Sequence, residues 1–187
     1  VAATILMESA LRGRTLGEIA AERGISVGQL CMELIMAAPG QHAAFLGMSE
    51  TNMREILRQP WVCAGSDNVS LQLDDANDFG HPRAVGTFPV FFHMVAEALG
   101  PAEAVRKMTS LPAAVFNIPR RGLIKPGYVA DLVLFSPERY ASHADYAGNN
   151  QAPEGVQMVM VAGKTAWDAR RPDDVGRHGR FIPIPAR

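Results

Sequence analysis

An acid closes an apolar run in this sequence of 187 residues. The run WVCAG, residues 61–65, has the composition of a strand buried on both faces, and Ser66 and Asp67 follow it directly. Ligands of parallel sheets bind beyond the carboxyl ends of the strands. A carboxylate at that place can ligate a metal or move a proton. Asp67 is therefore a candidate catalytic residue, and the alternative is that it only caps the following turn.

A second group of candidate residues lies in GHPRAVGTFP, residues 80–89, which we expect to be a loop that leads into a helix. Arg83 has the fork geometry that holds a substrate carboxylate through two hydrogen bonds, and His81 lies beside it in the sequence. Both are candidate substrate-binding residues. The alternative for Arg83 is an ion pair with a neighbouring acid. The acids close to it in sequence are Asp74, Asp75 and Asp78.

No other motif with a defined chemistry is present. The sequence has no GxSxG elbow, no Walker loop and no GxGxxG, and Ser66 has no evident base partner. The histidines form no HxH, HxxxH or HExxH pair, so no self-sufficient metal site is visible. These histidines are His42, His81, His93, His143 and His178.

Composition narrows the class of partner. Residues are 48% apolar and 20% charged and the formal net charge is −1, which favours small molecules or proteins over nucleic acid or an anionic membrane. The apolar stretches fall short of the roughly 20 residues that a membrane helix needs, and the first residues lack the pattern of a signal peptide. Cys31 and Cys63 have no CxxC spacing, so we expect buried thiols and a reducing cytoplasm. Because Val1 is not a natural start, we expect a processed chain or a piece of a longer one.

Hydrophobic periodicity predicts strands that alternate with helices, which is typical of α/β proteins with a parallel sheet, open or closed. After about Ile118 the pattern changes to strands separated by turns at Pro126–Gly127 and Ala162–Gly163. We therefore place a domain boundary between residues 1–118 and 119–187. The expected helices cover 15–24, 26–40, 49–60, 88–100 and 101–116, with strands at 42–48 and 61–65. We expect capping boxes to open the first two helices, Thr15 with Glu18 and Ser26 with Gln29, and Gly24 to end the first. The helix over 49–60 should direct Met53, Ile56 and Leu57 inward.

Five segments, in this order and spacing, resemble the D-aminoacylase, or N-acyl-D-amino-acid deacylase, branch of the amidohydrolase superfamily. They are GRTLGEIAAERG, FLGMSETNMREILRQPWVCAGSD, HPRAVGTFP, EAVRKMTSLPA and RGLIKPGYVADLVLFSP. The resemblance runs from about residue 13 to 165. The last segment marks only the superfamily, whereas GSD followed by HPR and GTFP points to the deacylase branch.

The resemblance implies a zinc-dependent hydrolase that cleaves the amide bond of N-acyl-D-amino acids. Its implied fold is α/β: residues 1–118 supply the last strands and helices of a TIM-like (β/α)8 barrel, and residues 119–187 supply β-sandwich strands and a tail. Asp67 matches the acid that contacts the metal or its bound water. In such enzymes this acid takes the proton of the attacking water and passes it to the departing amine.

The sequence also departs from the family. The HxH pair, the Cys, Lys or Glu ligand and the two later histidines of such enzymes are absent, and Asn68 stands where many relatives have Gly. We therefore expect an incomplete barrel that is inactive alone, with zinc absent or weakly bound. Its expected partners are the missing N-terminal part of the barrel or a second copy of the chain, which would cover exposed apolar surface.

Two alternative functions remain open. One is a non-catalytic binding or assembly domain derived from the barrel. The other is a different amidohydrolase, such as a dihydropyrimidinase-like or dihydroorotase-like ring opener, against which HPRAVGTFP argues.

Overall fold

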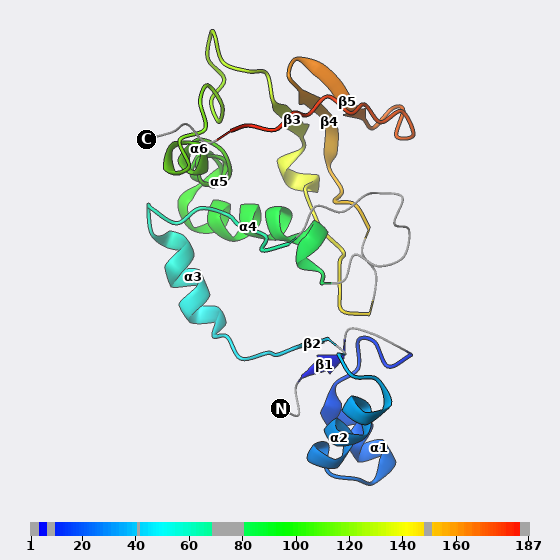
Figure 1. Cartoon of the computed structure of the whole chain (residues 1–187). Helices are drawn as coiled ribbons and strands as arrows, with labels where there is room; N and C mark the ends of the chain where they lie inside the picture. The colour runs from blue at the N-terminus through cyan, green and yellow to red at the C-terminus, as the bar shows by residue number, and fades with distance from the viewer. Residues whose placement is uncertain (1–3, 7–9, 41, 69–80, 148–150, 184–187) are drawn as a thin grey trace. The chain divides into compact units, whose positions relative to one another are not determined.

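The computed structural model describes residues 4–6, 10–40, 42–68, 81–147 and 151–183 (Figure 1). The backbone packs into two units, each built from separate stretches of the chain. Unit 1 comprises Val1–Asn52, Asp67–Val85 and His143–Gln151, and unit 2 comprises Met53–Ser66, Gly86–Ser142 and Ala152–Arg187. The domain boundary that the sequence predicts near residue 118 stays a prediction.

The first helix of unit 1, α1 (Leu16–Arg23), begins and ends where the sequence predicts. Thr15 accepts a hydrogen bond from the backbone N–H of Glu18, and the Glu18 carboxylate accepts one from the N–H of Thr15. This reciprocal capping box fixes the first turn. Gly24 ends the helix in the left-handed conformation, with φ of 66°.

The second helix, α2 (Val27–Ala37), is capped by the hydroxyl of Ser26, which accepts the N–H of Gln29 at 3.1 Å. The predicted capping box is only half formed, because the Gln29 amide donates to Glu33 instead. Both helices bury one face in a small apolar core. Its buried members are Leu6, Leu16, Ile19, Ala20 and Leu30.

A short antiparallel ladder completes unit 1. β1 (Ile5–Leu6) pairs with β2 (Ala43–Ala44). The strand expected over 42–48 is thus reduced to two residues, and Phe45 is 76% exposed. The prediction of a longer strand was wrong, because no neighbouring strand among the described residues supplies backbone hydrogen bonds beyond Ala44.

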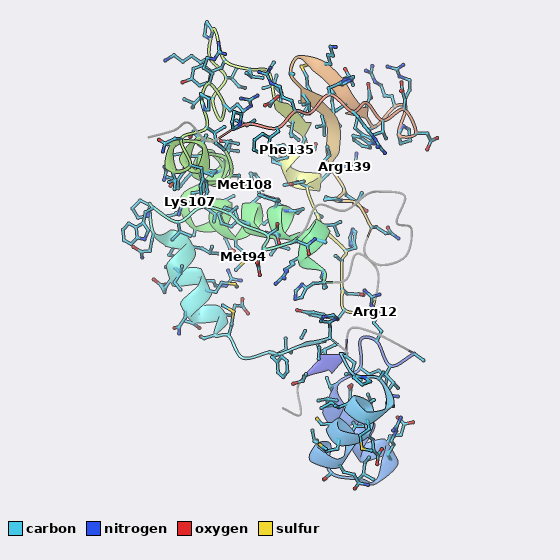
Figure 2. The ribbon with its side chains drawn as sticks, viewed as in Figure 1. Arg12, Met94, Lys107, Met108, Phe135 and Arg139 are labelled. Atoms are coloured by element: carbon cyan, nitrogen blue, oxygen red, sulfur yellow. The ribbon has the colours of Figure 1, made fainter. Side chains whose placement is uncertain are left out.

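Four helices follow, and they bring their apolar faces together in unit 2. Their bounds are α3 (Glu50–Arg58), α4 (Arg83–Leu99), α5 (Pro101–Met108) and α6 (Ser110–Val115). Met108 and Phe135 pack against the core of this unit (Figure 2). Ile56, which the periodicity placed inward, is 55% exposed. The buried core residues are Phe91, Phe92, Val95, Ala104 and Tyr140.

Helix α4 begins earlier than the sequence suggests, since the expected loop over 80–89 is helical from Arg83 onward. Pro82 precedes the helix, where a missing N–H costs nothing, and the His81 side chain accepts the N–H of Arg83. Pro89 lies inside the helix and is fully buried. Tertiary packing therefore overrides the local breaker signal that suggested a loop.

The expected strand at 61–65 does not form. Residues 62–68 have no regular secondary structure, and Trp61 is 69% exposed. Every strand pairing among the described residues is antiparallel, so the apolar run has no parallel neighbour here. A strand covered on both faces needs such neighbours to pair its backbone groups.

Unit 2 also contains a three-stranded antiparallel sheet in the order β3–β4–β5. The strands are β3 (Leu132–Phe135), β4 (Val156–Val161) and β5 (Lys164–Asp168), with a 3-10 turn, η1 (Pro137–Arg139), after β3. The predicted hairpin turn is confirmed, because Ala162 and Gly163 have φ of 52° and 80° between β4 and β5. The turn at Pro126–Gly127 is confirmed as well: Gly127 has φ of 82°.

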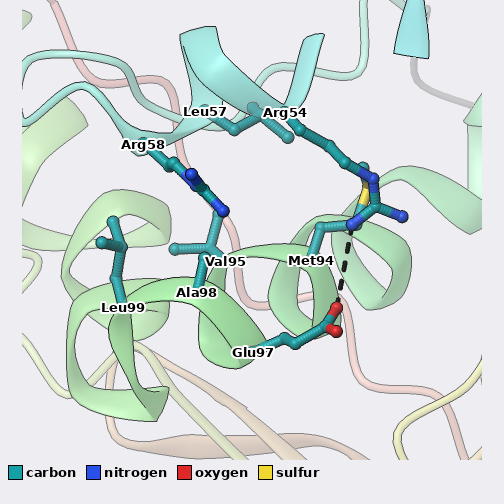
Figure 3. Close-up of a pocket in the computed structure, with 8 residues that line it drawn as sticks. All are labelled: Arg54, Leu57, Arg58, Met94, Val95, Glu97, Ala98 and Leu99. Carbon is teal, nitrogen blue, oxygen red and sulfur yellow. Dashed lines mark ion pairs between the residues drawn. The ribbon is translucent and has the colours of Figure 1, made fainter. Parts of the chain in front are cut away.

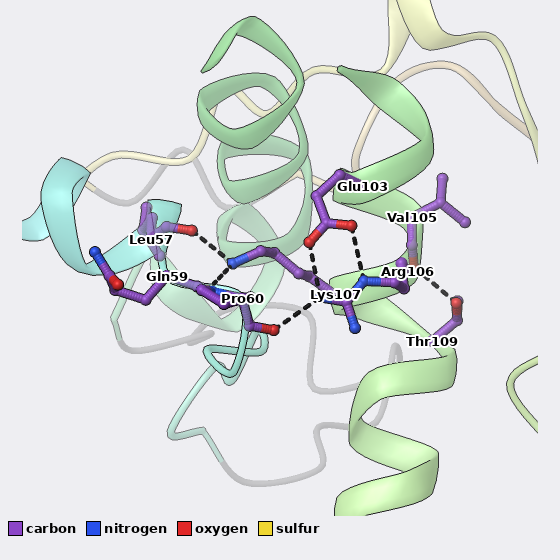
Figure 4. Close-up of polar contacts among 8 residues, drawn as sticks. All are labelled: Leu57, Gln59, Pro60, Glu103, Val105, Arg106, Lys107 and Thr109. Atoms are coloured by element: carbon purple, nitrogen blue, oxygen red, sulfur yellow. Dashed lines mark hydrogen bonds and ion pairs between the residues drawn. The ribbon is translucent and has the colours of Figure 1, made fainter. Parts of the chain in front are cut away.

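A buried lysine joins α5 to the end of α3 (Figure 4). Lys107 is fully buried, and its Nζ donates to the carbonyl of Leu57 at 2.7 Å and to that of Gln59. Arg106 donates to the carbonyl of Pro60 at 2.7 Å. Two side chains of α5 therefore satisfy the carbonyls that the end of α3 leaves unpaired.

A small hollow lies between α3 and α4 (Figure 3). Arg54 and Glu97 form an ion pair of 3.7 Å beside it. Its volume is about 200 Å³, below the roughly 300 Å³ of typical ligand pockets, so we do not assign it a ligand.

Among the described residues, no helix is long and apolar enough to cross a membrane. Cys31 and Cys63 are free thiols in partly buried positions.

Candidate functional site

Asp67 occupies an unusual backbone position. Its φ is +49°, in the left-handed region that most side chains avoid but aspartate tolerates. Its side chain is 90% exposed. The residue therefore presents its carboxylate to solvent from irregular backbone, and the preceding run is not a strand.

Arg83, at the start of α4, forms an ion pair with this carboxylate: Nη1 lies 3.0 Å from Oδ2 of Asp67. The two residues belong to the same unit. The structure thus joins two of the residues that the sequence singles out, and among the described residues one partner of Arg83 is the candidate catalytic acid. The three acids considered as alternative partners, Asp74, Asp75 and Asp78, lie outside the described residues.

His81 lies between Arg83 and a residue from a distant part of the chain. Its Nδ1 accepts the backbone N–H of Arg83 at 3.1 Å, and its Nε2 lies 3.2 Å from the hydroxyl of Tyr146. Since Nδ1 is an acceptor, the ring proton belongs on Nε2 and is donated to Tyr146. Burial, reinforced by the charge of Arg83, lowers the pKa of His81 below its usual value, which favours this neutral form.

Tyr146 is the member of the site that sequence reasoning missed. Its ring meets the His81 ring edge to face, with centroids 5.1 Å apart and an interplanar angle of 79°. The two residues are 65 positions apart, and Tyr146 lies in a turn outside the helices and strands. No motif or spacing links them, so only the fold could have found the pair.

The described residues do not form a metal site by themselves. No group of three or more His, Cys, Asp or Glu side chains among them could hold a metal ion. Asp67 could supply one oxygen ligand, whereas a zinc site uses three or four protein ligands. The described residues alone therefore do not complete the zinc site that the resemblance implies for the longer enzyme, and any further ligands would lie outside the part described.

The arrangement combines a carboxylate, a guanidinium, a neutral imidazole and a phenol in one unit. A carboxylate can accept a proton from water, and a guanidinium is suited to a second carboxylate.

Comparison with known proteins identifies the class. A model described as "Amidohydrolase family" matches residues 3–166, and the chain belongs to this family. The match includes Asp67, His81, Arg83 and Tyr146.

Curated relatives narrow the similarity to the deacylase branch. The chain is 35% identical over 179 residues to the N-acyl-D-aspartate deacylase of Alcaligenes xylosoxydans xylosoxydans, covering 91% of the chain and 34% of the relative. It is 38% identical over 160 residues to the D-aminoacylase of the same organism, covering 84% of the chain and 31% of the relative. The chain thus spans about a third of the length of these relatives. The predicted resemblance is confirmed.

Solved structures agree. An N-acyl-D-glutamate deacylase from Bordetella bronchiseptica, complexed with zinc and a phosphonate inhibitor, matches with a TM-score of 0.75 and 30% identity over 95% of this chain and 36% of that one. A D-aminoacylase described with a binuclear metal centre matches with a TM-score of 0.72 and 33% identity over the same shares. The predicted fold class, the C-terminal part of a TIM-like barrel plus strands of a small β-sandwich, is confirmed at this level. The individual strand expected at 61–65 is the exception.

Proposed function

We propose that the protein containing this chain hydrolyses the amide bond of N-acyl-D-amino acids, with Asp67 as the proton shuttle. The observation that carries the proposal is the Asp67–Arg83 pair at 3.0 Å, in a chain 35% identical to an N-acyl-D-aspartate deacylase. A water molecule attacks the amide carbon while Asp67 accepts its proton. Asp67 then passes the proton to the amide nitrogen as the C–N bond breaks. The products are a carboxylate and the free D-amino acid.

We assign Arg83 and His81 to substrate binding. An N-acyl amino acid carries a carboxylate, and a guanidinium can hold it through two parallel hydrogen bonds. In the described residues the same guanidinium holds Asp67. Substrate binding would therefore compete for Arg83 and release the Asp67 carboxylate, which would link binding to the availability of the base.

The zinc that the family resemblance implies would supply electrostatic activation of the amide and of the water when bound. Asp67 would provide one oxygen ligand, and the remaining ligands would come from outside the described residues. The support for this is the zinc complex of the Bordetella relative.

The two free thiols, Cys31 and Cys63, support a reducing, cytoplasmic setting.

We propose that the main partner of this chain is the remainder of a longer polypeptide. An apolar groove of about 760 Å³ in unit 2 borders α5, α6 and β3. Strand β3 lies at an edge of its sheet, with Val133 and Leu134 exposed by 57% and 55%. Exposed apolar edges are usually covered, and relatives have about two thirds of their length beyond the part matched here. A second copy of the chain is the alternative occupant.

The test is steady-state hydrolysis of N-acetyl-D-amino acids by the longest natural form of the protein. Asp67→Asn should lower kcat by a factor of about 10² to 10⁴, the range for loss of a general acid–base group. Asp173→Asn, the same change at an exposed position of unit 2, should leave kcat unchanged. Arg83→Lys should raise KM more than it lowers kcat, because a lysine cannot make two parallel hydrogen bonds. Full activity of Asp67→Asn would refute the role of Asp67 as proton shuttle. Absence of turnover in the unsubstituted protein would instead favour a binding or assembly domain.

A further inference from the structure

The His81 side chain joins the start of α4 to a loop near residue 146. One ring nitrogen accepts the N–H of Arg83 at 3.1 Å and the other faces the Tyr146 hydroxyl at 3.2 Å. A ring held at both nitrogens and stacked edge to face has little freedom to rotate. The orientation of the turn that presents Arg83 therefore depends on where Tyr146 lies.

Two contacts hold the loop that carries Tyr146. Asp145 accepts the N–H of Ala147 at 2.8 Å, which closes a tight turn around Tyr146. Ala147 packs against Gly13, where a Cβ atom would lie only 2.8 Å from the Ala147 Cα. Gly13 also has φ of +79°, so glycine is required there for conformation as well as for space. These contacts lie within unit 1.

We propose that Tyr146 is a further positioning residue of this site, which holds the His81 ring and through it the turn that presents Arg83 to the substrate. The inference rests on the proposed function for the role of Arg83. Its structural part, the coupling of Tyr146 to His81, stands on the geometry and can be tested without substrate.

The kinetic test compares Tyr146→Phe with Tyr128→Phe in the longest natural form of the protein. Phenylalanine keeps the ring contact and removes only the hydroxyl, so we expect KM for N-acetyl-D-amino acids to rise about threefold to tenfold, as for one lost hydrogen bond, with kcat nearly unchanged. Tyr128, in unit 2, loses the same hydroxyl and belongs to neither the hydrogen bonds nor the ion pair described for Asp67, His81 and Arg83 among the described residues. Equal KM values for the two variants would overturn the inference.

A double-mutant cycle tests whether Tyr146 acts through His81. His81→Asn keeps an acceptor for the N–H of Arg83 but is too short to reach Tyr146. The double variant should therefore have the KM of His81→Asn alone. Additive effects on KM would show that Tyr146 acts independently of His81 and would overturn the inference.

Imidazole ¹⁵N chemical shifts of the folded protein provide a readout that a general loss of stability does not move. In the unsubstituted protein, His81 should show the tautomer with a proton on Nε2, and Tyr146→Phe should shift the Nε2 resonance. Gly13→Ala, which displaces Ala147, should have the same effect while leaving the hydroxyl in place. Unchanged Nε2 shifts in both variants would overturn the inference. Absence of turnover in the unsubstituted protein would instead overturn the proposed function, while the spectra still test the coupling.

Discussion

Lys107→Met is the substitution that most directly tests how unit 2 is held together. Methionine keeps an apolar chain of similar length in the fully buried position and removes only the ammonium group. The carbonyls of Leu57 and Gln59 then lose the donor that satisfies them. The expected result is lower stability with the same fold.

The magnitude follows from two opposing effects. Each buried carbonyl left without a donor costs about 1–3 kcal/mol, which gives about 2–6 kcal/mol for two. Against this, the variant no longer has to bury a charge. Burial lowers the pKa of Lys107, because desolvation of the ammonium is unfavourable and the nearby Glu103 offsets it only in part. We therefore expect a net loss of about 2–4 kcal/mol.

The assay is urea unfolding followed by circular dichroism, with Lys164→Met as the matched control. Lys164 is exposed at the hairpin of β4 and β5, so the same substitution there should change the free energy of unfolding by less than about 0.5 kcal/mol. A Lys107→Met variant that unfolds at the same urea concentration as the control would refute the reasoning. It would mean that the two carbonyls find other donors or that the charge contributes nothing net.

Three further predictions follow from single features. The isolated chain of 187 residues should bind no stoichiometric zinc and should not hydrolyse N-acetyl-D-amino acids. A sample of verified mass that contains stoichiometric zinc and also shows turnover would contradict the proposal that the site is incomplete in this chain. Because the pKa of His81 is lowered in the folded state, the contribution of the neutral imidazole to the free energy of unfolding is fully present above pH 6.5 and is lost as the pH falls through that lowered pKa. His81→Asn should therefore flatten the pH dependence of the free energy of unfolding between the lowered pKa and pH 6.5. Gly155→Ala should destabilise the protein by about 2–4 kcal/mol and Gly127→Ala by about 1 kcal/mol. Both glycines have positive φ, but of the two only Gly155 has backbone where a Cβ would lie, with the Arg139 carbonyl carbon 2.5 Å away. Equal losses of stability for the two variants in thermal unfolding would contradict this.

Local signals predicted local structure well. The capping box at Thr15, the glycine stop at Gly24 and the hairpin turn at Ala162–Gly163 depend on residues close in sequence, and the structure confirms each. The prediction of a strand at 61–65 was wrong, because strand formation depends on hydrogen bonds and packing from neighbouring strands. The helix start at Arg83 failed for a related reason: burial of Pro89 outweighs its helix-breaking character.

In the candidate site, too, the sequence predicts residue types and positions but not long-range contacts. Asp67 and Arg83 could be named from residue type and position, but no pattern in WVCAGSD specifies their ion pair or the backbone φ of +49° at Asp67. Tyr146 could not be predicted as a site residue, because its contact with His81 depends on a loop that packs against Gly13, which is distant in the sequence. Gly13 shows how such a contact is encoded: a residue without a side chain makes room for the Tyr146 loop, and its effect on His81 is exerted entirely through packing. A substitution at Gly13 should therefore alter substrate binding although Gly13 touches neither Arg83 nor Asp67 in the hydrogen bonds and ion pairs described.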